Sequence, residues 1–413
     1  MVEHYFKRFG WCPRQIASPP PAGLGLVVVI PCFNEPGLLD ALNALARCTP
    51  PSRDVEIIVV VNSGENAPSE ILAQNRASLI QAKAWIAEHS SPRFAAHLLD
   101  FPALPAKHAG VGLARKIGMD EALRRFAAVN RLDGVILCFD ADCGCDPNYL
   151  VEVERHFAEH PRSPGCSIYF EHPLDSEAIA LYELHLRYYV QGLRFAGFPH
   201  AYHTIGSSMA VRVDAYLKQG GMNKRKAGED FYFLHKIIPL GNFGEINRTR
   251  VVPSPRASDR VPFGTGRAVR EYQRGEAMTT YPLRAFDDLR ELFAQVPALF
   301  ASDPRRMPPA IEAFLATVDF PAALAEIRSN TTSPQAFAKR FFRWFDGFLA
   351  MKFIHFARDR HHGSADVTDA ARSMLERFGI ADSDPLARYR ELQSGTLPIK
   401  NAEESSSLGV ESL

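Results

Sequence analysis

Between residues 24 and 139, short continuous apolar runs take turns with segments in which apolar residues recur at helical spacing. Short apolar runs bounded by turn formers are typical of strands buried on both faces of a sheet. Between the first two runs, Leu38, Leu42 and Leu45 recur at helical spacing. The expected strands are 24–30, 56–61, 95–99 and 134–139. The expected helices between them are 35–46, 68–88 and 112–126. This alternation predicts a parallel sheet with helices on both faces.

Beyond residue 142 the pattern changes to a mixture of strands and helices. The expected elements are a helix over 176–193, a strand over 207–212, a helix over 230–238 and a strand over 248–252. From residue 266 onward helical periodicity dominates.

An aromatic segment, 337–356, stands out within the helical region. It carries apolar rings at spacings of four and three: Phe337, Phe341, Phe345 and Phe348. This spacing predicts a buried helix that packs a C-terminal lobe. The alternative for the segment is a dimer or acceptor surface.

The composition is that of an ordinary globular protein. Of the 413 residues, 46% are hydrophobic and 23% are charged, and the length exceeds that of a typical single domain. Lys and Arg total 47 and Asp and Glu total 47, so no net field attracts a polyanion. We therefore expect no nucleic acid partner.

Cysteine usage and hydropathy bear on where the protein acts. The seven cysteines are scattered and odd in number, which favours a reducing compartment. No apolar run approaches the ~18 residues of a transmembrane helix, and residues 1–21 contain no apolar stretch of signal-peptide length. We expect a soluble, cytoplasmic protein with no transmembrane segment.

Two carboxylates follow the fourth expected strand, as Asp140-Ala141-Asp142. Ligands of parallel sheets bind at the carboxyl ends of the strands. Mg²⁺ and Mn²⁺ prefer oxygen ligands and are held by one or two carboxylates together with substrate phosphates. The pair therefore predicts a divalent cation that anchors a diphosphate. Read alone, the motif has an alternative: two loop acids that cap the segment beginning at Asp146-Pro147.

The order and spacing of several blocks favour the metal site over the capping acids, because together these blocks resemble the family 2 glycosyltransferases of GT-A fold. The blocks span about residues 24–255 and are 27–35, 56–62, 110–118, 139–143 with 147–150, 206–212, 220–222 and 228–230. The resemblance implies a Rossmann-like mixed sheet flanked by helices, followed by a mainly helical C-terminal lobe. It also implies an inverting transfer of a hexose from a UDP- or GDP-sugar to a hydroxyl of an unidentified acceptor, such as a sugar or small metabolite.

The resemblance assigns roles to particular residues. Asp142 is expected to bind Mn²⁺ or Mg²⁺, and Asp140 to share the metal or face the ribose. Asp230 is expected to be the base, ionised by the helix N-terminus, and Glu229 to orient the acceptor or the base. The expected nucleotide-binding residues are Pro31, Cys32, Asn34, Glu35, Asn62, Arg115 and Asp140.

Two departures from the family pattern concern the base and the metal. Asn62 stands where an acid usually reads the nucleobase, so uracil and guanine are not distinguished. No histidine occurs in the twenty-odd residues after His235 to complete the metal site, and Asp259 is either a substitute or an exposed loop acid. The segment 253–266, together with Arg267, resembles a loop that closes over the donor, with Arg256, Arg260 and Arg267 to neutralise the diphosphate. A linker with solvated charges is the alternative there.

These assignments predict a division of the chain. The expected parts are a lead-in (1–23), a glycosyltransferase domain (24–265), a helical C-terminal lobe (266–395) that could carry a homo-oligomer contact, and a disordered tail (396–413). Two alternative functions stay open: a catalytically silent nucleotide-sugar binding module, and a nucleotidyltransferase on a similar sheet. The latter needs a basic, Gly-rich loop after the first strand, and residues 31–35 are not such a loop.

Overall fold

The computed structural model describes residues 1–256, 269–272, 274–380 and 383–397. The chain divides into two compact units: Met1–Pro173 with Thr204–Gly264, and Leu174–His203 with Thr265–Leu413. Asp259, Arg260, Arg267 and the tail from residue 398 lie outside the described residues.

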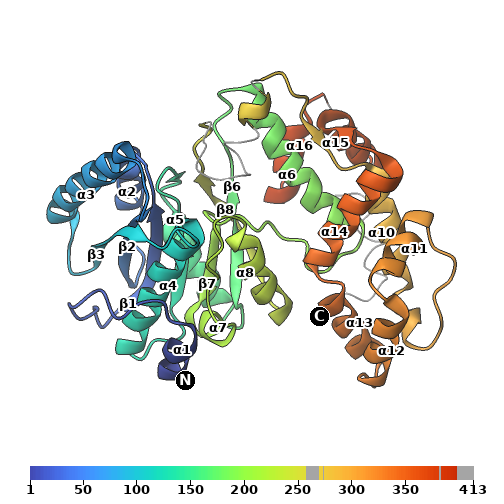
Figure 1. The fold of residues 1–413 in the computed structure, drawn as a ribbon, viewed down its shortest axis with the longest axis horizontal. Helices are drawn as coiled ribbons and strands as arrows, with labels where there is room; N and C mark the ends of the chain where they lie inside the picture. The colour runs from blue at the N-terminus through green and yellow to red at the C-terminus, as the bar shows by residue number, and fades with distance from the viewer. Residues whose placement is uncertain (257–268, 273, 381–382, 398–413) are drawn as a thin grey trace. The chain divides into compact units, whose positions relative to one another are not determined.

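The first unit is built on a mixed sheet (Figure 1). Its strands are β1 (Leu24–Cys32), β2 (Asp54–Gly64), β3 (Phe94–Leu104), β4 (Val135–Cys138), β5 (Gly144–Cys145), β6 (Gly165–Phe170), β7 (Met209–Arg212) and β8 (Gly244–Val252). Over the described residues these eight strands form one sheet in the order β3-β2-β1-β4-β7-β6-β8-β5. Neighbours from β3 to β4 are parallel, whereas β7 runs antiparallel to β4 and β6. The expected mixed sheet is confirmed.

Helices cover this sheet and complete the first unit. They are α1 (Val2–Phe9), α2 (Leu38–Ala46), α3 (Ser69–His89), α4 (Val111–Ala128), α5 (Tyr149–Glu159), α7 (Val213–Lys218) and α8 (Glu229–Ile237). Residues Leu24–Cys32 are buried throughout, as a strand covered on both faces must be. A Cβ at Gly118 of α4 would collide with Val29, so this glycine lets α4 pack closely on β1.

The elements expected between residues 24 and 139 are all present, with ends that differ by up to five residues. Five elements of the first unit were not expected: α1, β5, α5, β6 and α7. The signal for α5 is visible in retrospect, because Leu150, Val153 and Phe157 recur at spacings of three and four. Strand β6 is only six residues long and every one is buried, so it shows no alternation that could mark it.

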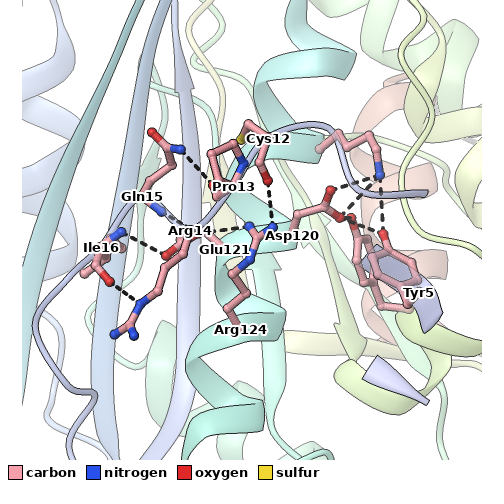
Figure 2. Close-up of polar contacts among 11 residues, drawn as sticks. Tyr5, Cys12, Pro13, Arg14, Gln15, Ile16, Asp120, Glu121 and Arg124 are labelled. Atoms are coloured by element: carbon pink, nitrogen blue, oxygen red, sulfur yellow. Dashed lines mark hydrogen bonds and ion pairs between the residues drawn. The ribbon is translucent and has the colours of Figure 1, made fainter. Parts of the chain in front are cut away.

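The N-terminal segment lies along α4 and is fastened there by polar contacts (Figure 2). The Arg124 side chain donates to the Cys12 carbonyl at 2.7 Å, and the Glu121 carboxylate accepts from the backbone N–H groups of Gln15 and Ile16 at 3.2 and 3.0 Å. We call residues 11–16 the strap. Its position is set by α4, the helix whose first turns contribute to the candidate site.

The second unit is mainly helical. Its helices are α6 (Glu177–Phe195), α10 (Leu283–Gln295), α11 (Pro309–Thr317), α12 (Phe320–Ser329), α13 (Pro334–Trp344), α14 (Gly347–Ala357), α15 (Val367–Arg377) and α16 (Pro385–Ser394). Two short strands, β9 (Thr279–Thr280) and β10 (Ala365–Asp366), pair antiparallel. An apolar core runs through these helices. No helix in the described parts of the chain is both long and apolar enough to cross a membrane.

The aromatic segment forms two helices, α13 and α14, instead of the single helix expected over 337–356. Asp346 explains the break, because its carboxylate accepts from the backbone N–H groups of Phe348 and Leu349 at 3.0 and 2.9 Å and so caps a new helix. Phe337, Phe341 and Phe345 are fully buried. The prediction that this segment packs the lobe is therefore confirmed, while its continuity was wrong.

Candidate functional site

The Asp140-Ala141-Asp142 motif lies directly after β4, at the edge where the parallel strands β1 and β2 also end. The Phe139 N–H donates to the Val29 carbonyl at 3.1 Å, so pairing with β1 continues up to the motif. The side chains of Asp140 and Asp142 are 35% and 23% exposed. Both carboxylates are thus held at the sheet edge with access to solvent.

Arg115, in the second turn of α4, joins the motif to the start of α8. Its guanidinium is buried and contacts Oδ1 of Asp140 with one nitrogen and Oε1 of Glu229 with another. A Cβ at Gly206 would collide with the same guanidinium, so the chain before β7 passes close by it. Three segments far apart in the sequence therefore meet at one arginine.

The charge on Arg115 is secured by its surroundings. Burial acts to lower the pKa of Arg115, but the negative charges of Asp140 and Asp230 outweigh it and raise the pKa. The buried side chain is therefore a permanent cation among three carboxylates: Asp140, Glu229 and Asp230.

Asp230 is held by two backbone amides. Its Oδ2 accepts from the Gly206 N–H and its Oδ1 from the Phe231 N–H, both at 2.8 Å. Burial raises the pKa of Asp230 and prevails over Arg115 and these two amides, which lower it. The sequence suggested that the helix N-terminus keeps Asp230 ionised, but burial has the larger effect on its pKa. A carboxylate with a raised pKa is a stronger base, and each oxygen keeps a second lone pair for a substrate hydroxyl.

Glu229 faces a different way from its neighbour. It is only 2% exposed and its carboxylate contacts Arg115. Its backbone carbonyl accepts from the Asn223 side chain at 2.8 Å. The structure therefore brings Glu229 to the guanidinium and away from solvent, whereas Asp230 is half-buried.

Four of the residues expected to bind the nucleotide lie at the end of β1 or directly after it. Pro31 and Cys32 are buried within β1, paired with β2, so they shape the strand end. Asn34 adopts a left-handed backbone conformation, with φ of 49°, and its N–H donates to Oδ1 of Asn75 at 2.9 Å. Glu35 is 1% exposed and accepts from the Gly37 N–H at 2.6 Å.

Asn62 lies near the end of β2 and is 2% exposed. Its backbone carbonyl accepts from Nδ2 of Asn75 at 2.9 Å, whereas its side-chain Oδ1 has no hydrogen-bond partner among the described residues. A buried acceptor without a partner is costly, which is the property expected of an atom that waits for a ligand donor.

Asn75, on α3, was missed by sequence reasoning. Its amide holds the loop after β1 through Asn34 and the end of β2 through Asn62. In the sequence it is one polar residue in a helix of mixed character, so no signal marked it.

Arg256 lies between the loop after β1 and the Asp motif. Its Nη2 is 2.7 Å from both oxygens of Glu35 and 3.8 Å from Oδ2 of Asp142. The side chain is 46% exposed. This is the one arginine of the three expected to close over the donor that falls within the described residues.

The carboxylates of the site fit a hard divalent cation that shares its coordination with a ligand. In the described part of the chain, no three His, Cys, Asp or Glu side chains converge on a point that could hold a metal ion. Mg²⁺ and Mn²⁺ sites of this kind need only one or two carboxylates, with phosphate and water supplying the rest. Asp142 and Asp140 meet that requirement.

The sequence matches no family model, and no curated protein matches it. Among solved structures, the chain is similar to S. aureus TarS 1–349 in complex with UDP-GlcNAc, at 15% identity over 90% of this chain and 92% of that chain, with a TM-score of 0.40. It is also similar to the mannosyltransferase PcManGT from Pyrobaculum calidifontis in complex with GDP-Man and Mn²⁺, at 15% identity over 95% and 91%, with a TM-score of 0.39. Since both TM-scores lie below 0.5, we infer function from the residues of this chain.

The assembled site combines three chemical capabilities. Asp140 and Asp142 offer carboxylate oxygens to a cation at a strand edge. Asp230 offers a carboxylate with a raised pKa. Asn62 offers an unpartnered acceptor near the end of β2, which is separated from β4 by β1. Such a set suits a substrate with a hydrogen-bonding base, a diphosphate and a reacting hydroxyl partner.

Proposed function

We propose that this protein is an inverting, metal-dependent glycosyltransferase that moves a hexose from a nucleoside diphosphate sugar to a hydroxyl of an acceptor. The observation that carries the proposal is the Arg115 bridge between Asp140 and Glu229. These two residues are 89 positions apart in the sequence, and the bridge brings the proposed metal motif and the proposed base, Asp230, to one site.

Asp142 is the main metal ligand in this proposal, and Asp140 shares the metal or faces the ribose. When bound, Mn²⁺ or Mg²⁺ neutralises the negative charge that develops on the departing nucleoside diphosphate. Arg256, between Glu35 and Asp142, is positioned to exchange its carboxylate contacts for a phosphate oxygen.

Asp230 acts as the base. The acceptor hydroxyl loses its proton to a carboxylate oxygen of Asp230 as its own oxygen attacks the anomeric carbon. The bond from that carbon to the diphosphate oxygen breaks on the opposite face, and the electron pair leaves with the nucleoside diphosphate. One displacement of this kind inverts the anomeric configuration.

Glu229 and Arg115 are positioning residues in this scheme. Glu229 holds the guanidinium, and the guanidinium holds Asp140 and sets the charge around Asp230. On the nucleotide side, Oδ1 of Asn62 accepts from an N–H of the base. Uracil and guanine both present such a donor, so UDP- and GDP-sugars are both candidate donors.

The Asp230→Asn variant tests the chemistry. Transfer from a panel of UDP- and GDP-sugars with Mn²⁺ should fall by about 10²–10⁴-fold, because general base catalysis contributes that much. Donor binding, measured as a Mn²⁺-dependent thermal shift, should be nearly unchanged. Asp214→Asn is the matched control, since Asp214 pairs with Lys218 on the surface.

The outcomes separate the proposal from its alternatives. Undiminished turnover in Asp230→Asn would exclude this residue as the base. A donor that binds with metal but is never turned over by the wild type would favour the silent binding module. A protein that shows no metal-dependent shift with any donor would contradict the nucleotide-sugar site itself.

A further inference from the structure

Three consecutive basic residues, Lys224-Arg225-Lys226, precede Glu229 and Asp230 and are all exposed. The chain as a whole carries equal numbers of basic and acidic residues. Within the described residues, none of the three forms an ion pair with a carboxylate. Like charges held side by side repel one another, so this local excess of positive charge is not explained by the needs of folding.

The loop that carries them is fixed against the N-terminus of α4. A Cβ at Gly110 would lie 2.9 Å from Cα of Lys226, and one at Gly112 would collide with the Arg225 carbonyl, so only glycine allows this close approach. The Arg225 N–H also donates to Oδ1 of Asn223 at 3.1 Å. The basic side chains therefore project from a fixed stretch of backbone beside the first turns of α4, the helix that carries Arg115.

Aromatic side chains flank the three cations. The Lys224 ammonium lies 4.8 Å from the centre of the Trp11 ring, and the Arg225 guanidinium lies 3.7 Å from that of Tyr232, in the first turn of α8. The His108 ring packs against Trp11 at 5.7 Å. Cation–π contacts of this kind hold long side chains in place without cancelling their charge.

Two further features concern this surface: the strap that carries Trp11 is held in place, and the nearby acids are paired with other residues. Trp11 begins the strap, which Arg124 and Glu121 hold on α4 (Figure 2). The nearby acids are already engaged, because Asp120 is buried against Lys116 at 3.1 Å and Glu229 is buried against Arg115. We call Trp11, His108, Lys224, Arg225 and Lys226 the basic surface. Its positive charge stays available to a ligand.

We propose that the basic surface is an acceptor subsite that binds a phosphate group, so that the hydroxylic acceptor is a phosphate ester. This inference rests on the proposed glycosyl transfer, since it places the ester next to Asp230. Arginine and lysine bind phosphate oxygens through charge-assisted hydrogen bonds, and a phosphate supplies enough negative charge to offset several cations. A neutral polyol has no use for three unpaired cations.

Direct binding tests the subsite without any turnover. Inorganic phosphate and glycerol 3-phosphate are titrated against the full-length protein by calorimetry, with glycerol as the neutral control. Lys224→Gln, Arg225→Gln and Lys226→Gln are combined in one variant. A matched control combines Lys83→Gln, Arg162→Gln and Lys218→Gln. These residues are exposed elsewhere on the first unit, and their replacement removes the same amount of charge.

We expect the patch variant to lose at least about tenfold in affinity for both phosphate ligands, as the loss of charge-assisted hydrogen bonds predicts, and the control variant to keep wild-type affinity. A second patch variant, Arg225→Lys with Lys226→Arg, keeps the charge and should retain most of the binding. The proposed subsite would be contradicted if the variant with all three glutamines bound phosphate as tightly as the wild type. It would also be contradicted if the wild type bound no phosphate.

Acceptor kinetics connect the subsite to transfer. Release of nucleoside diphosphate is measured with glycerol, glycerol 3-phosphate and the diester glycerophosphoglycerol, which separates a small phosphomonoester from a phosphodiester polymer as the source of the phosphate. One phosphate ester should exceed glycerol at least about tenfold in kcat/KM, and the patch variant should lose this preference through KM. Equal use of glycerol would refute the inference even if transfer occurs. Phosphate binding at the basic surface without transfer from any donor would instead refute the proposed function alone.

Discussion

Replacing Arg115 with methionine removes the cation on which the site converges. Methionine keeps much of the side chain's length but leaves Glu229, which is 2% exposed, as a buried carboxylate without its partner. Breaking a buried ion pair by removing one member costs about 3–5 kcal/mol. Asp140 is 35% exposed and solvent screens its charge, so its lost contact adds about 0–1 kcal/mol. We expect a total loss of about 3–6 kcal/mol.

The loss should depend on pH with a definite sign. The buried Glu229 of the variant is expected to take up a proton on folding, whereas a glutamate in the unfolded chain releases its proton above about pH 4.3. Because the folded state then binds more protons, stability falls as pH rises, by at most about 1.4 kcal/mol per pH unit for one proton. The defect of Arg115→Met should thus be larger at pH 8 than at pH 5. Adding Glu229→Gln should remove this pH dependence and restore part of the stability.

Urea unfolding at several pH values measures the effect, and transfer kinetics measure its consequence. Arg115 lowers the pKa of Asp230, so its removal raises that pKa further and should move the acid limb of the rate profile to higher pH. Arg125→Met is the matched control, because Arg125 pairs with the fully buried Glu56 away from the site. It should destabilise the protein comparably without moving the acid limb.

Two results would refute this reasoning. A loss below about 1 kcal/mol at pH 8 would mean that the Arg115 and Glu229 contact is not a buried ion pair in solution. An unchanged acid limb in a folded Arg115→Met protein would mean that Asp230 does not respond to this guanidinium, or is not the group that titrates.

Three further substitutions test other parts of the structure. Asp142→Asn should abolish the Mn²⁺-dependent rise in melting temperature with a UDP- or GDP-sugar, a stabilisation of about 2.7 kcal/mol at donor concentrations of 100 times Kd; a retained rise would place the metal elsewhere. Tyr5→Phe removes the hydroxyl that donates to the buried Asp120 at 2.6 Å, and should lower the free energy of unfolding in urea by about 1–3 kcal/mol. An unchanged free energy of unfolding would show that the N-terminal helix is not needed to satisfy that carboxylate. Asp346→Ala removes the cap that separates α13 from α14 and should cost about 0.5–2 kcal/mol; no loss would mean that aromatic packing alone sets the break.

Much of the first unit followed from local pattern. The strand ending before Asp140 is an uninterrupted apolar run, and the helix before it has Gly118 where close packing on β1 requires one. The C-terminal lobe was predictable as helical, but its break at Asp346 was not, because helical spacing of phenylalanines continues across it. A single capping carboxylate overrode a periodicity shared by two helices.

The sequence by itself determined which side chains stand at the ends of strands, since burial dictates apolar runs and the polar residues follow where those runs stop. It also supplied Asp142 and Asp230 as candidates. Only the tertiary structure decided that Glu229 contacts Arg115 while Asp230 is held by the Gly206 amide. It also decided that Asn75 joins the loop after β1 to the end of β2, and that the basic surface forms beside α4. The physical reason is range: local pattern fixes elements, whereas ion pairs and burial depend on segments that meet only in the folded chain.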